Sequence, residues 1–395
     1  MLEIIRAEGV ILSPNSQLPT PNSQLPTPNS QLSLPPLVSI IIPHFNRPQL
    51  LGEALASVRA STEQRFEIIV VDDGSSAADW EAVQALADER TRIFRRSDGI
   101  KGPSRCRNLS LAEAKGDYVV FLDSDDLMAS WCLEQRLMES EKAPDADFWV
   151  FPVMLFRDKP GDLDLLWNSM ADGRDDVGRF ARSDPPWHTS SPLWKTSSLR
   201  KLGGFNEAVF YGDDADLHLR ALLSGLKARQ FPEAMPDLFV RRSDSPRITN
   251  SLTSALIESR RIRLREGMRF LKSVVAGTPY RPAWEGQYIV EAEFLLFNHT
   301  PAKRPIQQVL ENWQCDCRPS RMRRTIVNGY FSVALACRQH AYLILRIARR
   351  IVMKVLPSCY FPNGGQYHRA RAEADVLSAI RSRLVESGRK TAAYT

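Results

Sequence analysis

The sequence lacks several features that would each assign it to a familiar class. Its most apolar stretch, residues 325–350, is interrupted by Arg338 and His340, so it falls below the roughly 18 uninterrupted apolar residues of a membrane-spanning helix. Cysteine is scarce, with 6 in 395 residues and no CxxC pair, and Glu3 and Glu8 stand where a signal peptide would need an apolar run. We therefore expect no transmembrane segment and a reducing, cytoplasmic location.

Acidic residues are also missing from one long part of the chain. None occurs between Asp316 and Glu373, where the charged residues are Arg318, Arg321, Arg323, Arg324, Arg338, Arg346, Arg349, Arg350, Lys354, Arg369 and Arg371. Residues 342–356 have helical periodicity, with isoleucine and valine on one side and the basic residues on the other. Such a helix suits the anionic inner face of a membrane or the surface of the rest of the chain. We expect no nucleic-acid partner, because no recognisable nucleic-acid-binding motif accompanies the charge.

The remaining composition, 43% hydrophobic and 25% charged, is that of a globular protein. Residues 14–32 are an exception and read PNSQLPTPNSQLPTPNSQL, with two prolines in each seven-residue unit. Proline removes a backbone donor and breaks helices, which excludes a coiled coil. We expect residues 1–36 to form a disordered N-terminal segment.

From residue 37 onward, short β-rich runs such as VSIIIP, FEIIVVDD and YVVFLD alternate with helical segments. Strands that are apolar throughout and separated by helices are typical of a parallel sheet covered on both faces. We predict an α/β fold with a doubly wound, mostly parallel sheet over residues 37–245. The strand pattern stops near residue 246, so residues 246–395 are predicted to be a helical, basic C-terminal region.

Carboxylates gather where the predicted strands end. Asp73 follows FEIIVVD, and Asp123, Asp125 and Asp126 follow YVVFL. Parallel sheets bind ligands at the carboxyl ends of their strands, and clustered carboxylates suit a hard divalent cation that also takes phosphate oxygens. Arg107 lies on the helix before the second group and could contact phosphate. The structural alternatives are an Asp-Gly turn at Asp73 and a solvated acidic loop at 123–126.

A second acidic pair, Asp213 and Asp214, opens a predicted helix in the segment GGFNEAVFYGDDADLHLRALLSG. Capping and the helix dipole would explain acidic residues at this position. A general base for a hydroxyl group would also need such a carboxylate, provided that the fold brings it near the first cluster.

These segments, taken together and in this order, resemble the family 2 glycosyltransferases of GT-A fold over about residues 37–245. The resemblance implies transfer of a sugar from a nucleoside-diphosphate sugar, with inversion at the anomeric carbon. It also implies Mg²⁺ or Mn²⁺ as cofactor and a glycan or lipid-linked acceptor in cell-surface polysaccharide or glycolipid synthesis. We expect such an enzyme to act peripherally on the inner face of the cytoplasmic membrane.

The resemblance assigns roles to individual residues. Those that would contact the nucleotide are Pro43, Phe45, Asn46, Asp73, Arg107 and Asp123. The sequence Asp123-Ser124-Asp125 matches the DxD motif of the family, and either Asp125 or Asp126 would ligate the metal ion directly. Asp214 matches the catalytic base, and Asp213 takes the first position of the acidic pair.

Two departures from the family pattern stand out. The family commonly has Glu-Asp where this chain has Asp213-Asp214, and a histidine that often follows the last strand is absent, which leaves phosphate contact there to Arg241, Arg242 or Arg247. Two other functions stay open: a non-catalytic protein that binds a nucleotide sugar or glycan, and a nucleotidyltransferase. The second is disfavoured because PHFNRPQ has no glycine-rich phosphate loop.

Further residues near the predicted site have two interpretations each. His44 and His188 could belong to the site or be packed side chains, and the absence of an HxxH motif or a cysteine partner disfavours zinc. Trp187 and Trp194 could stack on a sugar, although burial is the commoner role of tryptophan.

Overall fold

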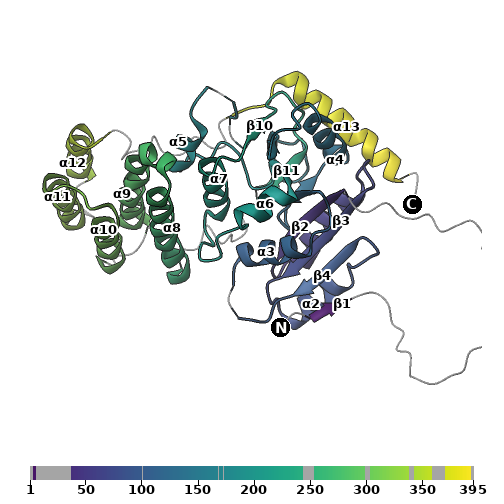
Figure 1. Ribbon diagram of the computed structural model, residues 1–395, viewed down its shortest axis with the longest axis horizontal. Coiled ribbons are helices and arrows are strands. Elements are labelled where there is room, and N and C mark those ends of the chain that lie inside the picture. The colour runs from purple at the N-terminus through teal and green to yellow at the C-terminus, as the bar shows by residue number, and fades with distance from the viewer. Residues whose placement is uncertain are drawn as a thin grey trace, which may run out of the picture.

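The computed structural model places a mixed sheet at one end of the molecule and a bundle of helices at the other (Figure 1). It describes residues 3–5, 37–99, 101–167, 169–171, 173–242, 253–298, 303–337, 342–357 and 370–392. The repeats at 14–32 and Arg247 lie outside these residues. Among the described helices, none has the length and apolar character needed to cross a bilayer.

The central sheet has eight strands in the order β1-β4-β3-β2-β5-β9-β7-β10. Strands β2 to β5 run parallel, and β9 pairs antiparallel with both β5 and β7. A second sheet has the order β6-β11-β8. The strands are β1 (Glu3–Ile5), β2 (Val38–His44), β3 (Phe66–Asp72), β4 (Thr91–Arg95), β5 (Tyr118–Phe121), β6 (Leu127–Met128), β7 (Phe148–Val150), β8 (Val153–Phe156), β9 (Pro192–Lys195), β10 (Ala228–Gln230) and β11 (Leu238–Arg241). The predicted α/β class with a mostly parallel sheet is confirmed.

Helices cover both faces of the sheet, so strands such as β3 are buried along their whole length. In the first half of the chain the helices are α1 (Pro48–Arg59), α2 (Ala77–Gln84), α3 (Pro103–Glu113), α4 (Cys132–Ser140), α5 (Asp176–Ala181), α6 (Thr196–Leu202) and α7 (Asp213–Leu223). Proline in the first turn of α1 and α3 suits a helix start, since the amide it removes has no partner there.

The helical region consists of α8 (Ser254–Ser273), η1 (Val275–Tyr280), α9 (Arg281–Asn298), α10 (Lys303–Cys317), α11 (Arg321–Cys337) and α12 (Tyr342–Val355). The last helix, α13 (Ala374–Ala392), instead packs beside the sheet (Figure 1). Ile380 is fully buried there in a cluster with Trp131 and Phe156. The C-terminal part of the chain therefore contributes to both ends of the molecule.

Candidate active site

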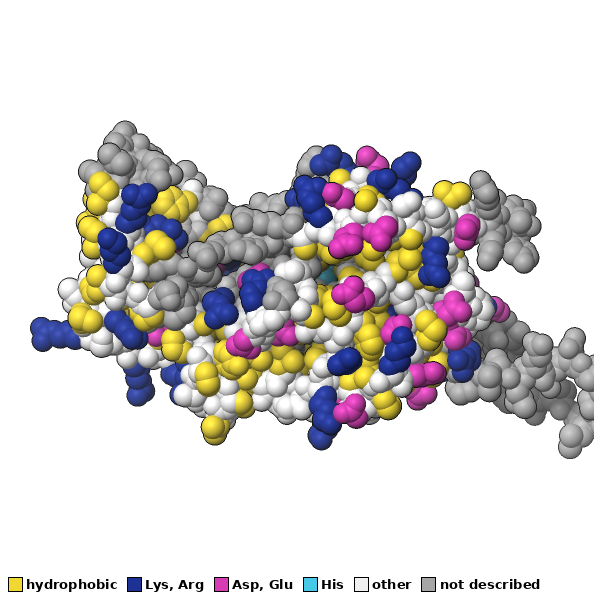
Figure 2. Space-filling model, turned by 90° about the horizontal axis from the view of Figure 1, so that it is seen from above, with side chains coloured by type: hydrophobic (Ala, Val, Ile, Leu, Met, Phe, Trp, Pro, Cys, Tyr) yellow, Lys and Arg dark blue, Asp and Glu magenta, His cyan; other side chains and the backbone are white. Residues whose placement is uncertain are grey.

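The predicted site residues lie at one edge of the sheet, because β2, β3 and β5 are parallel and end together. Acidic side chains gather on one face over the sheet half of the molecule, whereas basic side chains predominate over the helical half (Figure 2). Since β3 and β5 both pair in parallel with β2, the acidic residues that follow them lie at the same edge of the sheet.

Asp73 lines a cavity of about 310 Å³ beside the ends of β3 and β4, together with Arg96 and Lys101. Its two carboxylate oxygens accept hydrogen bonds from Arg96 Nη1 and, at 2.8 Å, from the backbone N–H of Gly102. Burial raises the pKa of Asp73, and these donors oppose that effect. Asp73 therefore organises the cavity wall, and each of its oxygens keeps a further lone pair for a ligand N–H.

The loop after β2 forms the other side of this region. The ring of Phe45 is exposed, and Lys101 Nζ lies 4.4 Å from its centroid. Asn46 has φ 52° and accepts a hydrogen bond from Ser76 N–H at 2.9 Å, which ties this loop to the loop after β3. Pro43 is part of β2 itself and pairs with Val71.

His44 is a structural residue rather than an exposed one. It is buried, and its Nδ1 lies 3.0 Å from Asp72 Oδ1. Burial acts to raise the pKa of Asp72, but the hydrogen bonds with His44 and Ser75 lower it below its ordinary value. This pair fixes the strand ends from which Asp73 and Phe45 extend.

The three aspartates after β5 have different surroundings. Asp126 is buried and accepts the backbone N–H of Arg241 at 2.9 Å, whereas Asp125 Oδ2 accepts from Arg47 Nη1 at 3.1 Å. Ligand atoms of Asp123, Asp126 and His188 lie within 4.8 Å of one another. Two carboxylates and an imidazole fit a divalent cation such as Mn²⁺. The geometry thus adds His188 to the predicted Asp126, while Asp125 lies outside this group.

Arg107 connects the aspartates after β5 with the acidic pair on α7. Its Nη2 donates to Asp123 Oδ1 and its Nη1 to Asp213 Oδ2, both at 2.7 Å. The guanidinium also stacks over the ring of Phe205, 5.0 Å from its centroid. The fold therefore satisfies the condition set for the second acidic pair, since one side chain contacts both groups.

Asp213 and Asp214 are held differently. Asp213 is buried and also accepts from Ser104 Oγ at 2.9 Å. Asp214 is half-buried, and its Oδ1 accepts the N–H of Ala215 at 2.8 Å. Burial, reinforced by the charge of Asp213, raises the pKa of Asp214 to about 6. A carboxylate with a pKa near neutrality is suited to accept a proton.

The helical region supports the loop that carries this pair. Ser259 Oγ on α8 accepts the backbone N–H groups of Phe210 at 3.2 Å and Tyr211 at 3.1 Å. Gly212 has φ 68°, and a Cβ at this position would lie 3.0 Å from Arg263 Cδ. Arg260 stacks on Tyr211 at 4.4 Å and pairs with Glu291 on α9 at 2.7 Å. The start of α7 is therefore anchored from outside residues 37–245.

Other residues weighed from the sequence have structural positions. Trp187 and Trp194 are buried around His218, which stacks on Trp194 with an interplanar angle of 7°. Burial lowers the pKa of His218 to about 3. Arg241 donates from Nε to the carbonyl of Asp125 at 2.9 Å and pairs with Glu53, so it braces the aspartate loop. Sequence reasoning missed Ser104, Arg96 and the partnership of His188 with the aspartates.

Residues 39–183 match the family described as Glycosyl transferase family 2. The chain carries a family 2 glycosyltransferase domain. Among curated relatives, it is 36% identical to GalNAc(5)-diNAcBac-PP-undecaprenol beta-1,3-glucosyltransferase of Campylobacter jejuni, over 46% of this chain and 58% of that protein. It is 35% identical to UDP-Glc:alpha-D-GlcNAc-diphosphoundecaprenol beta-1,3-glucosyltransferase WfaP of Escherichia coli, over 27% of this chain and 43% of that protein. The chain thus spans less than two thirds of either relative.

The solved structure of S. aureus TarS 1–349 in complex with UDP-GlcNAc has a similar fold. The TM-score is 0.58 at 14% sequence identity, and the match covers 85% of this chain and 99% of TarS 1–349. The likeness extends beyond the family 2 domain, since residues 39–183 make up a smaller part of the chain. The mixed sheet and helical region together thus form a known arrangement.

Proposed function

We propose that this protein transfers a sugar from a nucleoside-diphosphate sugar to a hydroxyl group of a lipid-linked glycan, with inversion at the anomeric carbon. The proposal rests mainly on Arg107, which pairs with both Asp123 and Asp213. Through this side chain the carboxylates that could bind a cation lie close to Asp214, whose pKa is raised. The names of the two glucosyltransferase relatives, which specify undecaprenol-linked acceptors, support the substrate class.

In this proposal Asp214 is the general base. The acceptor hydroxyl oxygen forms a bond to the anomeric carbon, the bond from that carbon to the diphosphate oxygen breaks, and the hydroxyl proton passes to Asp214. The diphosphate leaves with the electron pair of the broken bond. Asp213 cannot share this role equally, because Ser104 and Arg107 already donate to its carboxylate. Its charge instead helps to keep the pKa of Asp214 high enough for proton transfer.

The donor would lie along the strand ends, with its base in the cavity beside Asp73 and its diphosphate toward Asp123. Phe45 and Asn46 would border the nucleoside, as the sequence predicted. Asp123, Asp126 and His188 would hold Mg²⁺ or Mn²⁺, with Asp125 as the alternative ligand predicted from the sequence. A divalent ion at this position supplies positive charge that stabilises the departing diphosphate.

The acceptor would be presented at an anionic membrane surface. Ile347, Ile351 and Val355 form one row on α12 and are 49%, 58% and 51% exposed, so this row does not pack against the rest of the described chain. Arg350 and Lys354 are exposed beside it. An exposed apolar row flanked by basic residues supports peripheral binding, because the apolar side chains enter the headgroup boundary while the cations contact anionic lipids.

Calorimetric titration with UDP, GDP and dTDP, with and without Mn²⁺, tests the donor site. We expect one nucleotide to bind in a metal-dependent manner to the wild type and more weakly to Asp126→Asn, since that substitution removes a ligand charge. Asp214→Asn should bind the same nucleotide normally, because its carboxylate lies on the acceptor side.

Transfer to a lipid-linked acceptor is then measured on the same variants. Asp214→Asn should lose activity by about 10²–10⁴-fold, the usual contribution of a general base. Equal transfer by the wild type and Asp214→Asn would refute the base assignment. Nucleotide binding without turnover by the wild type would instead favour a non-catalytic binding protein.

A further inference from the structure

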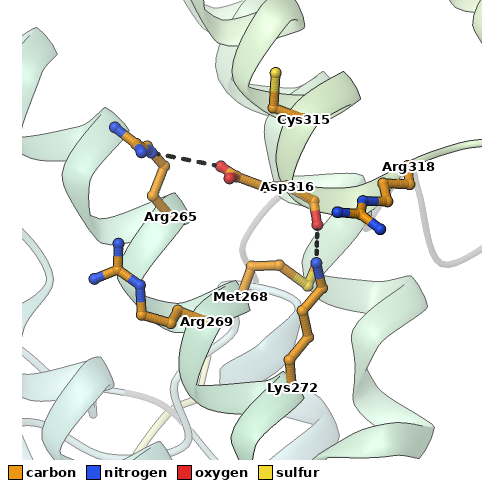
Figure 3. Close-up of a pocket in the computed structure, with 7 residues that line it drawn as sticks. All are labelled: Arg265, Met268, Arg269, Lys272, Cys315, Asp316 and Arg318. Carbon is orange, nitrogen blue, oxygen red and sulfur yellow. Dashed lines mark hydrogen bonds and ion pairs between the residues drawn. The ribbon is translucent and has the colours of Figure 1, made fainter.

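A second cavity lies far from the strand ends, between α8 and the C-terminal end of α10, and has a volume of about 200 Å³. Figure 3 shows Arg265 and Arg269 extending from α8 on one side, Arg318 facing them from the other, and Lys272 below. Lys272 follows Ser259, which supports the catalytic loop, by 13 residues of helix, or about 20 Å along the axis. The cavity is therefore separate from the proposed active site.

The charge in this cavity is unbalanced. Its lining contains four cationic side chains, namely Arg265, Arg269, Lys272 and Arg318, against the single carboxylate of Asp316. That carboxylate accepts from the Tyr288 hydroxyl at 3.0 Å, and it lies 3.7 Å from Arg265 Nε. Lys272 donates to the backbone carbonyl of residue 316 and not to the carboxylate. Outside the lining, Glu266 pairs with Arg269 Nη1 at 2.5 Å, so Asp316 and Glu266 together compensate two of the four positive charges.

The backbone at Arg318 brings its side chain toward the others at some conformational cost. Its φ is 51°, in the left-handed region that residues other than glycine, asparagine and aspartate seldom adopt. The residue directly follows α10, and its N–H still donates to Gln314 O at 3.2 Å. A left-handed residue at this position is a common helix end, and it leaves the Arg318 side chain facing Arg265 and Arg269 (Figure 3). Arg318 thus adds a fourth cation to a cavity in which the other three already repel one another.

We propose that this cavity binds a phosphate group. Guanidinium groups donate paired hydrogen bonds to phosphate oxygens, and an ammonium group adds a point charge, so the set matches a phosphate monoester or diphosphate. The cationic heads reach solvent, as Arg265, Arg269, Lys272 and Arg318 are all exposed, and a ligand can enter directly. The phosphate can come from free phosphate compounds or from lipid headgroups.

The test compares binding of inorganic phosphate and pyrophosphate to the full chain and to variants, by calorimetry. Arg265→Gln and Lys272→Gln should each weaken binding about tenfold, because each removes a charge-assisted hydrogen bond. Arg324→Gln is the matched control, since Arg324 is an exposed arginine on α11 that does not line the cavity. Asp316→Asn should have the opposite effect and tighten binding, while its amide oxygen can still accept from Tyr288.

A second arm distinguishes the sources of the phosphate. Phosphatidylcholine vesicles carry either phosphatidic acid or an equal charge of oleate, and bound protein is measured by sedimentation. If the phosphate comes from lipid headgroups, Arg265→Gln should bind less to the phosphatidic acid vesicles but unchanged to the oleate vesicles. If it comes from free phosphate compounds, the substitution should affect binding to both kinds of vesicle equally. Equal binding of pyrophosphate by the wild type, Arg265→Gln and Lys272→Gln would overturn the proposal. Neither arm requires turnover, so failure of the proposed transferase activity leaves this inference testable.

Discussion

Replacement of Arg107 by glutamine should reduce both the stability of the fold and the activity of the site. The Arg107 side chain is 5% exposed and pairs with Asp213, which is 11% exposed, and with Asp123, which is 32% exposed. Removing one partner of a buried ion pair costs about 3–5 kcal/mol, whereas a partly exposed pair contributes at most about 1 kcal/mol. We therefore expect the free energy of unfolding to fall by about 3–5 kcal/mol, most of it from the loss of the pair with Asp213.

Thermal unfolding by calorimetry measures this loss. For a domain of about 200 residues, each kcal/mol lowers Tm by about 2–4 °C, so the Tm of Arg107→Gln should fall by roughly 10 °C. Arg105→Gln is the matched control on the same helix. Arg105 is 28% exposed, and its ion pairs with Asp98 and Glu207 are long, at 3.4 and 3.7 Å, so its loss should cost less than about 1 kcal/mol.

The same variant should change the pH dependence of transfer. Burial and Asp213 raise the pKa of Asp214, and the charge of Arg107 opposes them. Without this guanidinium the pKa of Asp214 rises further, so the acidic limb of the rate profile should move to higher pH. A Tm equal to that of Arg105→Gln, together with an unmoved pH profile, would refute the bridging role of Arg107.

Three further predictions concern other parts of the molecule. In the wild type, kcat/KM should rise as the pH increases through about 6, because Asp214 accepts a proton only as a carboxylate, and a flat profile from pH 5 to 7 would exclude it as the base. Arg136 and Asp237 form a fully buried pair at 2.6 Å, so Arg136→Met should cost about 3–5 kcal/mol in chemical denaturation and Arg136→Met/Asp237→Leu should recover much of it. Ile351→Glu on α12 should reduce sedimentation with anionic vesicles while leaving nucleotide binding unchanged, and unaltered sedimentation would contradict the membrane proposal.

The sheet and its strand ends were predictable because their signals are local. Continuous apolar runs before Asp73 and Asp123 predicted buried parallel strands, and parallel strands place their carboxyl ends at one edge. The sequence could not predict that Asp213 lies near this edge, because 106 residues separate it from Arg107, with which it forms a hydrogen bond. Confirming this proximity required the fold.

Side-chain partnerships were harder to predict, because they depend on rotamers and on distant segments. His188 gave no ligand spacing in the sequence, yet it lies with Asp123 and Asp126. Trp187 and Trp194 were possible sugar platforms, but both are buried around His218. Hydrophobic periodicity also could not reveal which surface an amphipathic helix meets, and for this reason the return of α13 to the sheet was not foreseen.

The support that α8 gives to residues 210–212 has a consequence for how this protein can lose activity. The two amide hydrogen bonds to Ser259 cross from the helical region to the loop before Asp213. Local unfolding of α8 would remove both hydrogen bonds and release the loop that leads into Asp213. Transfer should therefore require a folded helical region, even though the sequence that matches the family ends well before α8 begins.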